Sequence, residues 1–128
     1  MTRRRRIDPD LAKLREKPWQ QRIERRARAL GALTCHVNKA RMVSGNWITP
    51  TSDAGFPDLW CLFPNGRLVV FECKTEDAPP SKFTDRQREW IRRLQRGVND
   101  AYMVRPSDWP HVEALLEEAA TEPPTVDL

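Results

Sequence analysis

A predicted β-hairpin constrains the fold of this chain more than any other segment. Residues 58–63 and 67–74 are rich in apolar, β-branched and aromatic side chains, and the tripeptide Pro64-Asn65-Gly66 separates them. Proline suits the first corner of a type I turn, asparagine the second, and glycine the left-handed position that follows. The sequence therefore predicts two antiparallel strands joined by a three-residue loop.

The length of this loop decides which side chains meet at the open end of the hairpin. A three-residue loop pairs Phe63 with Arg67 and therefore Asp58 with Glu72, whereas a two-residue loop would pair Asp58 with Cys73. Directly opposed residues share a face of the sheet, so only the three-residue loop brings the two carboxylates together. Lys74 follows Glu72 by two residues and points the same way.

These three side chains predict a catalytic patch. Two carboxylates about 5 Å apart at Cβ repel each other unless a cation lies between them. Oxygen ligands of this kind suit a hard divalent cation, and a neighbouring ammonium suits a phosphodiester substrate. The structural alternative is that Lys74 extends to water or forms a plain salt bridge.

The rest of the chain predicts helices packed on a mixed β-sheet, an α/β fold. Trp19, Ile23, Ala27 and Leu30 form one apolar stripe. We expect helices over 10–31, 84–96 and 107–120, with Pro18 as a boundary or first-turn residue, further strands over 34–37 and 101–104, and an irregular loop over 38–57. Trp47 in that loop either covers the core or contacts nucleic acid.

Two polar residues on the predicted helices are further candidates for the site. Glu16 lies at heptad spacing before Ile23 and Leu30, so it points inward if the first helix reaches back that far. Alternatively, Pro18 ends the helix and Glu16 is a solvated first-turn acid that complements the helix dipole. Gln87 either closes a capping box with Thr84 or reaches into the site, and the two roles are compatible.

Composition and charge favour a DNA-binding protein of one domain. The chain has 128 residues, 39% of them hydrophobic and 31% charged, and a net charge of +4. Residues 1–31 hold nine arginines and two lysines against four acids, while residues 108–128 hold six acids and no lysine or arginine. A basic half favours a polyanionic partner, although a solvated tail is the structural alternative. The expected DNA contacts are Arg3, Arg4, Arg5, Arg6, Arg22, Arg25, Lys39 and Arg41.

The cysteines and the hydropathy pattern favour a cytoplasmic protein. Cys35, Cys61 and Cys73 have no metal-ligand spacing and each lies in an apolar stretch, so we expect buried free thiols in a reducing compartment. No apolar run approaches the ~20 residues of a membrane helix. We expect a disordered basic segment over 1–9, a folded domain over 10–120 and an acidic tail over 121–128.

The motifs in combination resemble the VRR-NUC family, a branch of the PD-(D/E)xK nuclease superfamily. The resemblance covers about residues 14–117. It is carried by Gly-Phe-Pro-Asp-Leu at 55–59, Phe-Glu-Cys-Lys-Thr-Glu at 71–76, Gln-Arg-Glu-Trp at 87–90 and Val-Arg-Pro-Ser-Asp-Trp at 104–109. Small proteins similar to this one are often from phages or bacteria.

The resemblance implies a restriction-endonuclease-like core and cleavage of DNA that depends on Mg²⁺ or Mn²⁺. It assigns metal binding to Asp58, Glu72, Glu16 and the backbone carbonyl of Cys73, catalysis to Lys74, and a supporting role to Gln87. His36 lies near a position that often carries histidine in similar sequences, and a structural role at the end of a strand is the alternative.

We therefore expect a Mg²⁺-dependent endodeoxyribonuclease of replication, repair or recombination that acts on branched DNA, in the manner of a Holliday-junction resolvase, as a homodimer. The alternatives are a DNA-binding or scaffold protein without activity and a monomeric flap or nicking nuclease.

Overall fold

The computed structural model describes residues 7–37, 40–41, 47–48, 53–97 and 100–121. Most of the predicted basic N-terminus, including Arg3, Arg4, Arg5 and Arg6, lies outside the described residues, as do most of the acidic tail and Lys39. For residues 40, 41, 47 and 48 only the backbone is described.

The centre of the fold is a four-stranded mixed sheet, as the sequence predicts. Its strands are β1 (Leu33–His36), β4 (Leu59–Leu62), β5 (Leu68–Cys73) and β6 (Asp100–Val104), in the spatial order β1-β4-β5-β6. The pairs β1–β4 and β4–β5 are antiparallel, and β5–β6 is parallel. β5 is central and buried along almost its whole length, which explains its nearly continuous apolar sequence.

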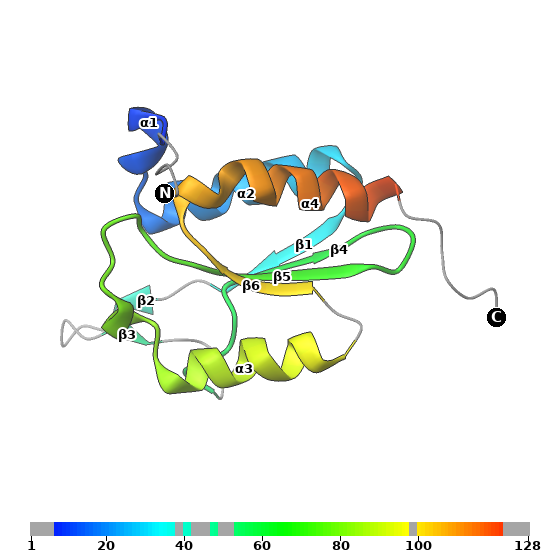
Figure 1. Cartoon of the computed structure of the whole chain (residues 1–128). Helices are drawn as coiled ribbons and strands as arrows, with labels where there is room; N and C mark the ends of the chain where they lie inside the picture. Colours follow the sequence, from blue (N-terminus) through cyan, green and yellow to red (C-terminus); the bar gives the residue numbers. More distant parts are fainter. Residues whose placement is uncertain (1–6, 38–39, 42–46, 49–52, 98–99, 122–128) are drawn as a thin grey trace, which may run out of the picture.

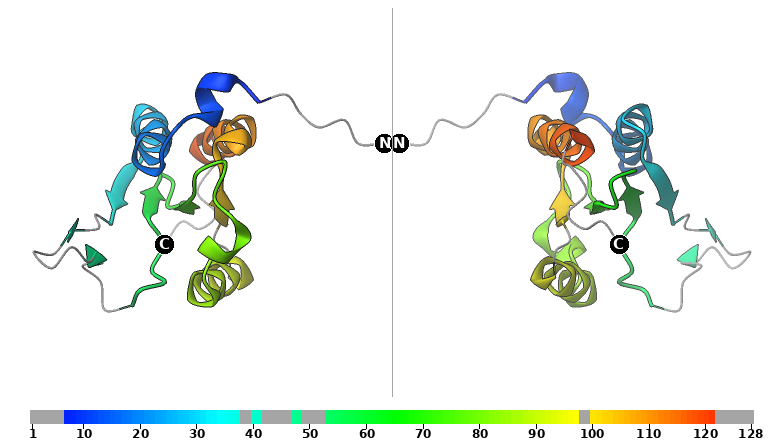
Figure 2. Two further views of the ribbon diagram at one scale, coloured as in Figure 1. Left: turned by 90° about the vertical axis from the view of Figure 1, so that its left-hand side faces the viewer. Right: turned by 90° about the vertical axis from the view of Figure 1, so that its right-hand side faces the viewer.

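Helices cover both faces of this sheet. They are α1 (Pro9–Ala12), α2 (Glu16–Ala29), α3 (Asp85–Arg96) and α4 (Trp109–Thr121), with 3₁₀ turns η1 (Pro80–Lys82) and η2 (Pro106–Asp108). The end-on views show α2 and α4 on one face and α3 on the other (Figures 1 and 2). Trp19, Ile23 and Ala27 of α2 are fully buried, so the predicted stripe is confirmed. Ile91 of α3 packs on Val70 from the opposite side.

The single helix expected over 10–31 is wrong, because the chain turns at residues 13–15. Arg15 is extended, with φ −73° and ψ 167°, and Leu14 between the two helices packs against the main core. Pro18 is the third residue of α2, where its missing N–H costs nothing because the first turn has no intrahelical acceptors. Gly31 follows the helix with a φ of +94°, as a C-terminal glycine should.

The loop expected over 38–57 contains some regular structure. β2 (Ala40–Arg41) pairs antiparallel with β3 (Trp47–Ile48), which makes a second, two-stranded sheet. Two residues per strand are too few for a periodicity to be visible in the sequence. The side chains of Arg41 and Trp47 lie outside the described part of the chain, so their predicted contacts are not addressed.

The hairpin has the predicted register. The Phe63 amide donates to the Arg67 carbonyl at 2.8 Å, and the Gly66 amide donates to the Phe63 carbonyl at 2.9 Å. Gly66 has a φ of +88°, the left-handed conformation that its position requires. The Asn65 side chain donates to the Ala119 carbonyl at 2.7 Å, so the turn is also attached to α4.

The prediction of three buried thiols is wrong for one of them. Cys61 and Cys73 are buried, whereas Cys35 on the outer strand β1 is exposed, and all three are free. An edge strand has one neighbour, so its side chains are less enclosed than those of a central strand. None of the described helices combines the length and apolar character needed to cross a membrane.

Candidate functional site

The polar residues of the hairpin are buried together at its open end. The register Leu59–Phe71 continues by one residue to place Asp58 opposite Glu72. Asp58 is 4% exposed, Glu72 1%, Lys74 6% and Gln87 7%. Buried charges are costly unless they are paired, and side chains of this kind occur in the interior chiefly for a specific reason.

Gln87 fills both of the roles that the sequence left open. Its side-chain oxygen accepts from the Thr84 amide at 3.0 Å, and the Thr84 hydroxyl accepts from the Gln87 amide at 3.2 Å, which completes the capping box of α3. Its side-chain nitrogen donates to Glu72 Oε1 at 2.9 Å. The cap fixes which end of the amide faces the sheet, so the start of α3 holds a donor on the carboxylate of β5.

Lys74 lies beside the same carboxylate oxygen. Its ammonium is 3.6 Å from Glu72 Oε1 and 5.9 Å from the centre of the Phe83 ring. The other cation near that ring is Arg105, whose guanidinium carbon lies 5.0 Å from the ring centre. An aromatic ring attracts cations over its face, so Phe83 helps to hold Lys74 in place.

Arg105 also shapes the segment that follows Lys74. One of its guanidinium nitrogens donates to the carbonyls of Thr75, Glu76 and Ala78 at 3.0, 3.0 and 2.7 Å. Three loop carbonyls are therefore satisfied by one side chain from the end of β6. Nothing in the local sequence indicates this contact, since the partners are about 30 residues apart.

Asp58 is fixed by the backbone of the opposing strand. Its Oδ2 accepts from the Cys73 amide at 3.0 Å. Pairs that exchange hydrogen bonds recur every second residue along the ladder, so the pair Phe63–Arg67 predicts the same type of pair at Pro57–Cys73. Proline has no amide hydrogen, and it therefore cannot donate to the Cys73 carbonyl. The Cys73 carbonyl, which is the predicted backbone ligand, therefore accepts no hydrogen bond within the β4–β5 ladder.

Three aromatic rings support the segment that carries Asp58. Phe56 stacks on Trp60 with centroids 5.1 Å apart, and it meets Trp90 of α3 edge-on at 5.2 Å. The Trp60 indole donates to the Pro57 carbonyl at 3.2 Å. Two residues of α3 therefore contact this region: Gln87 holds Glu72 of β5, and Trp90 packs on the segment that precedes β4.

Glu16 lies at the mouth of the site. It is the first residue of α2, and it lines a cavity of about 390 Å³ together with Lys74, Asp77 and Lys82. The helix begins at Glu16, so the first-turn position of the alternative is observed, while the half-buried side chain lines the same cavity as Lys74. α2 approaches β5 closely here: the Trp19 indole and the Lys74 amide both donate to the Val104 carbonyl, at 3.1 and 3.0 Å.

The Cys73 thiol is influenced by all three candidate acids. Its pKa is raised well above its ordinary value, first by burial and then by the negative charges of Asp58, Glu72 and Glu16. The thiol itself faces the core beneath α2 and α4.

The donor set fits a hard divalent cation. Carboxylate and backbone oxygens are the ligands that Mg²⁺ prefers, and the soft sulfur of Cys73 is directed away from them. Among the described residues, no three histidine, cysteine, aspartate or glutamate side chains are grouped so that side chains alone could hold a metal. The fit therefore depends on Asp58, Glu72 and the Cys73 carbonyl, with Glu16 as the outer member.

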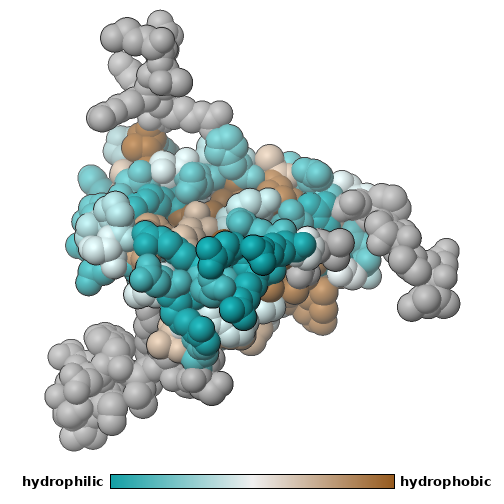
Figure 3. Space-filling model, turned by 60° about the horizontal axis from the view of Figure 1, so that its bottom comes forward, coloured by the Kyte–Doolittle hydropathy of each residue, from teal (hydrophilic) through white to brown (hydrophobic). Residues whose placement is uncertain are grey.

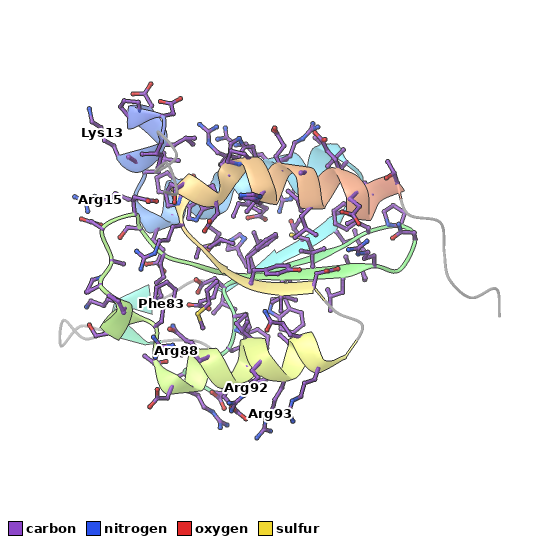
Figure 4. The ribbon with its side chains drawn as sticks, in the orientation of Figure 1. Lys13, Arg15, Phe83, Arg88, Arg92 and Arg93 are labelled. Carbon is purple, nitrogen blue, oxygen red and sulfur yellow. The ribbon has the colours of Figure 1, made fainter. Side chains whose placement is uncertain are left out.

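Exposed cations lie on both sides of the site. Figure 4 shows Lys13 and Arg15 before α2, and Arg92 and Arg93 on the outer side of α3. Arg92 and Arg93 both pair with Glu89, while Arg88 donates to the Pro80 carbonyl at 3.1 Å. Figure 3 brings α3 forward and shows a hydrophilic surface over it. Sequence reasoning did not name the α3 arginines as candidate DNA contacts, although they lie away from the apolar stripe of the helix predicted over 84–96.

The predicted DNA contacts on α2 differ in their surroundings. Arg25 is exposed, as expected. Arg22 is half-buried, and its guanidinium carbon lies 5.5 Å from the centre of the Trp109 ring, so it also packs against α4.

Sequence reasoning missed a buried acid on α2. Glu24 of α2 is 5% exposed and accepts from Arg28 at 2.6 Å and from Thr34 at 2.9 Å. His36 Nδ1 lies 3.0 Å from the second oxygen of Glu24. The signal was present in the spacing, because Glu24 and Arg28 are one helical turn apart and Thr34 and His36 share a strand face. His36 thus has a structural partner.

Comparison of the chain with models of protein families, with curated proteins and with solved structures gives no match in any of the three.

Proposed function

We propose that this protein is a metal-dependent endonuclease that hydrolyses DNA phosphodiester bonds. The observation that carries the proposal is the buried group at the end of β5: Glu72 accepts from Gln87 and lies beside Lys74, and Asp58 stands opposite it on β4. A structural core gains little from burying two carboxylates and an ammonium together, since apolar residues of similar size are as stable or more so.

The sheet and its helices are, in this proposal, the restriction-endonuclease-like core that the resemblance to VRR-NUC nucleases implies. Support comes from a β-hairpin that carries both acids and from helices on both faces of a mixed sheet. The Gln-Arg-Glu-Trp segment adds to it, because Gln87 and Trp90 both contact the hairpin side of the site.

Asp58, Glu72, the Cys73 carbonyl and Glu16 would hold Mg²⁺, which when bound lowers the pKa of water and neutralises phosphate charge. The other residues act directly. Lys74 orients the attacking water and stabilises the negative charge that develops on the phosphate oxygens. Gln87 holds the Glu72 carboxylate in one orientation, and Asp58 is held by the Cys73 amide. In-line attack on phosphorus would leave a 3′-hydroxyl and a 5′-phosphate.

Branched DNA and a homodimer complete the proposal. One site cuts one strand, so symmetrical cutting of a junction needs two copies. The cations on either side of the site support contact with the phosphate backbone without base-specific reading. Light scattering on the purified protein, free and bound to a four-way junction, tests the oligomeric state.

Cleavage assays test the activity. A four-way junction, a flap, a plain duplex and a single strand are incubated with the protein and Mg²⁺, Mn²⁺ or EDTA. We expect cutting with either metal and none with EDTA. Lys74→Ala should reduce the rate at least about a hundredfold, because a preorganised charge at the reacting phosphate is lost.

Lys82→Ala is the matched control, since Lys82 lines the same cavity but is exposed and lies outside the buried group. A small effect of Lys82→Ala beside a large effect of Lys74→Ala supports the assignment. Equal rates for Lys74→Ala and wild type, or no metal-dependent cutting of any substrate, would favour the alternative of a DNA-binding or scaffold protein. Cutting of flaps by a monomer would favour the flap nuclease.

A further inference from the structure

A groove lies between α2 and the edge strand β1. It has a volume of about 310 Å³, and its lining comes from α2 residues 17–28 together with His36 at the end of β1. The cations in it are Lys17, Arg25 and Arg28, and its acid is Glu24. The proposed reaction makes no use of these residues, although the sequence predicts Arg25 as a DNA contact.

Both ends of the lining lie close to the proposed ligands. Lys17 follows Glu16 directly in α2. On the other wall, Val37 follows His36, and its amide donates to the Asp58 carbonyl at 2.9 Å. The groove lies on the α2 face of the sheet, so it meets the site at the start of α2, where Glu16 lines the cavity beside Lys74 and Lys17 begins the groove.

The acid in the groove is already neutralised. Glu24 receives hydrogen bonds from Arg28 and Thr34, and His36 lies at its second oxygen. Arg28 also donates to the Thr34 hydroxyl at 2.7 Å, which closes the network. Because this buried network takes up the carboxylate, Glu24 organises one wall of the groove rather than repelling an anion.

The remaining charge is positive and available. Neither Lys17 nor Arg25 makes an ion pair with a described residue, and both are exposed. Gln20 and Gln21 between them add amide donors. A solvated helix face would carry mixed charges, whereas this concave surface presents cations and neutral donors around one acid that is already bound.

The dimensions suit a polynucleotide. The eleven residue steps from Lys17 to Arg28 span about 16 Å of helix. That length equals the rise of roughly five nucleotides in B-form DNA. Lysine, arginine and amide groups in a row bind phosphodiester oxygens without reading sequence.

We propose that the groove between α2 and β1 binds the sugar–phosphate backbone of the DNA strand that passes through the site. This inference rests on the proposed function, because the proposed cleavage site at one end of the groove determines which DNA strand would enter the groove. It is tested by binding, which does not require cleavage.

The experiment measures the affinity of fluorescein-labelled single-stranded and duplex DNA by anisotropy, in EDTA, at several salt concentrations. The double variant Lys17→Ala/Arg25→Ala is compared with wild type and with Arg96→Glu, which changes the net charge by the same two units at the exposed far end of α3. We expect at least a tenfold weaker affinity for the groove variant and a salt dependence reduced by about two counterions.

A second variant guards against misfolding. Gln21→Glu adds one negative charge to an exposed groove position and removes no contact, and it should weaken binding several-fold while circular dichroism stays that of wild type. If both groove variants bind as tightly as the α3 control variant, the inference is overturned. Groove-dependent binding without any Mg²⁺-dependent cutting would instead contradict the nuclease and leave the groove intact.

Discussion

At the scale of single residues, Gln87 connects stability to the site. One end of its amide caps α3 and the other end donates to Glu72, so the same side chain starts a helix and orients a proposed ligand. Two roles in one residue can be separated only by substitutions that remove one role at a time.

Gln87→Glu keeps the cap and removes the donor. A carboxylate at this position still closes a capping box, but it would lie against Glu72. We expect cleavage to fall at least about a hundredfold. Thr84→Ala is the matched control: it removes the cap, should lower the free energy of unfolding by about 1 kcal/mol, and should change the cleavage rate little. Chemical denaturation measures the free energy of unfolding, and initial rates measure cleavage. Similar losses of cleavage rate in the two variants would contradict a role of Gln87 in orienting Glu72.

Burial of the Cys61 thiol should make the free energy of unfolding depend on pH in the alkaline range. Burial, and secondarily the charge of Glu24, raises the pKa of its thiol to about 12. Above pH 9 an unfolded thiol ionises while the folded one does not, so this group's contribution is full below pH 9 and is lost as pH rises toward 12. Its slope is at most about 1.4 kcal/mol per pH unit.

We therefore expect urea unfolding of wild type between pH 8.5 and 11 to show a steeper loss of stability than that of Cys61→Ala. Cys35→Ala is the control, because Cys35 is exposed. Parallel curves for all three proteins would show that burial of the Cys61 thiol has no such effect.

At the scale of elements, the segment before β4 is held by a close contact with α3. Arg86 donates to both oxygens of Asp53, and the Arg86 guanidinium holds the pKa of that carboxyl well below its usual range. A Cβ on Gly55 would lie 2.5 Å from Arg86 Cγ and 2.7 Å from the Arg86 backbone carbon. Only glycine lets the chain pass α3 at this point.

Gly55→Ala should displace the segment that carries Asp58. We expect a loss of about 1–3 kcal/mol in the free energy of unfolding from the forced backbone shift. The cleavage rate should fall at the same time, because Asp58 lies three residues on. Ala54→Ser, at the exposed neighbouring position, should change neither quantity beyond about 0.5 kcal/mol. Thermal unfolding measures the stability, and initial rates measure the cleavage. Equal values of both for Gly55→Ala and Ala54→Ser would contradict the role of Gly55.

The elements also show what sequence can predict. Turn chemistry at 64–66 is local, and it predicted the register correctly; the stripe on α2 and the cap of α3 are local too. The break before Glu16 was missed because Leu14 turns inward to contacts that the sequence does not display. Arg105 was missed for the same reason, since its partners lie about 30 residues away, whereas Glu24 was missed although its spacing to Arg28 within α2 offered a signal.

At the scale of the whole molecule, the proposed metal site would couple binding of a metal to folding. A cation that binds only the folded protein stabilises it by mass action, and it also relieves repulsion between Asp58 and Glu72. The stability of the fold should then depend on divalent cations even when no DNA is present.

We expect Mg²⁺ or Mn²⁺ to raise the melting temperature of wild type by several degrees. Asp58→Asn retains an oxygen that can accept from the Cys73 amide, so its melting temperature in EDTA should equal or exceed that of wild type. Its response to metal should be largely lost. Calorimetry with and without EDTA measures the shift, and an equal shift in both proteins would remove Asp58 from the ligand set.

The number of residues in the turn at 64–66 decides which face of the sheet carries Asp58. The turn and Asp58 lie at opposite ends of β4, about five residues or 17 Å apart. Deleting one residue from the turn, far from any DNA, would rotate the start of β4 by one side chain and direct Asp58 away from Glu72. Substitutions in this turn therefore leave Asp58 and Glu72 on the same face. Insertions and deletions in the turn keep them together only if they change its length by an even number of residues.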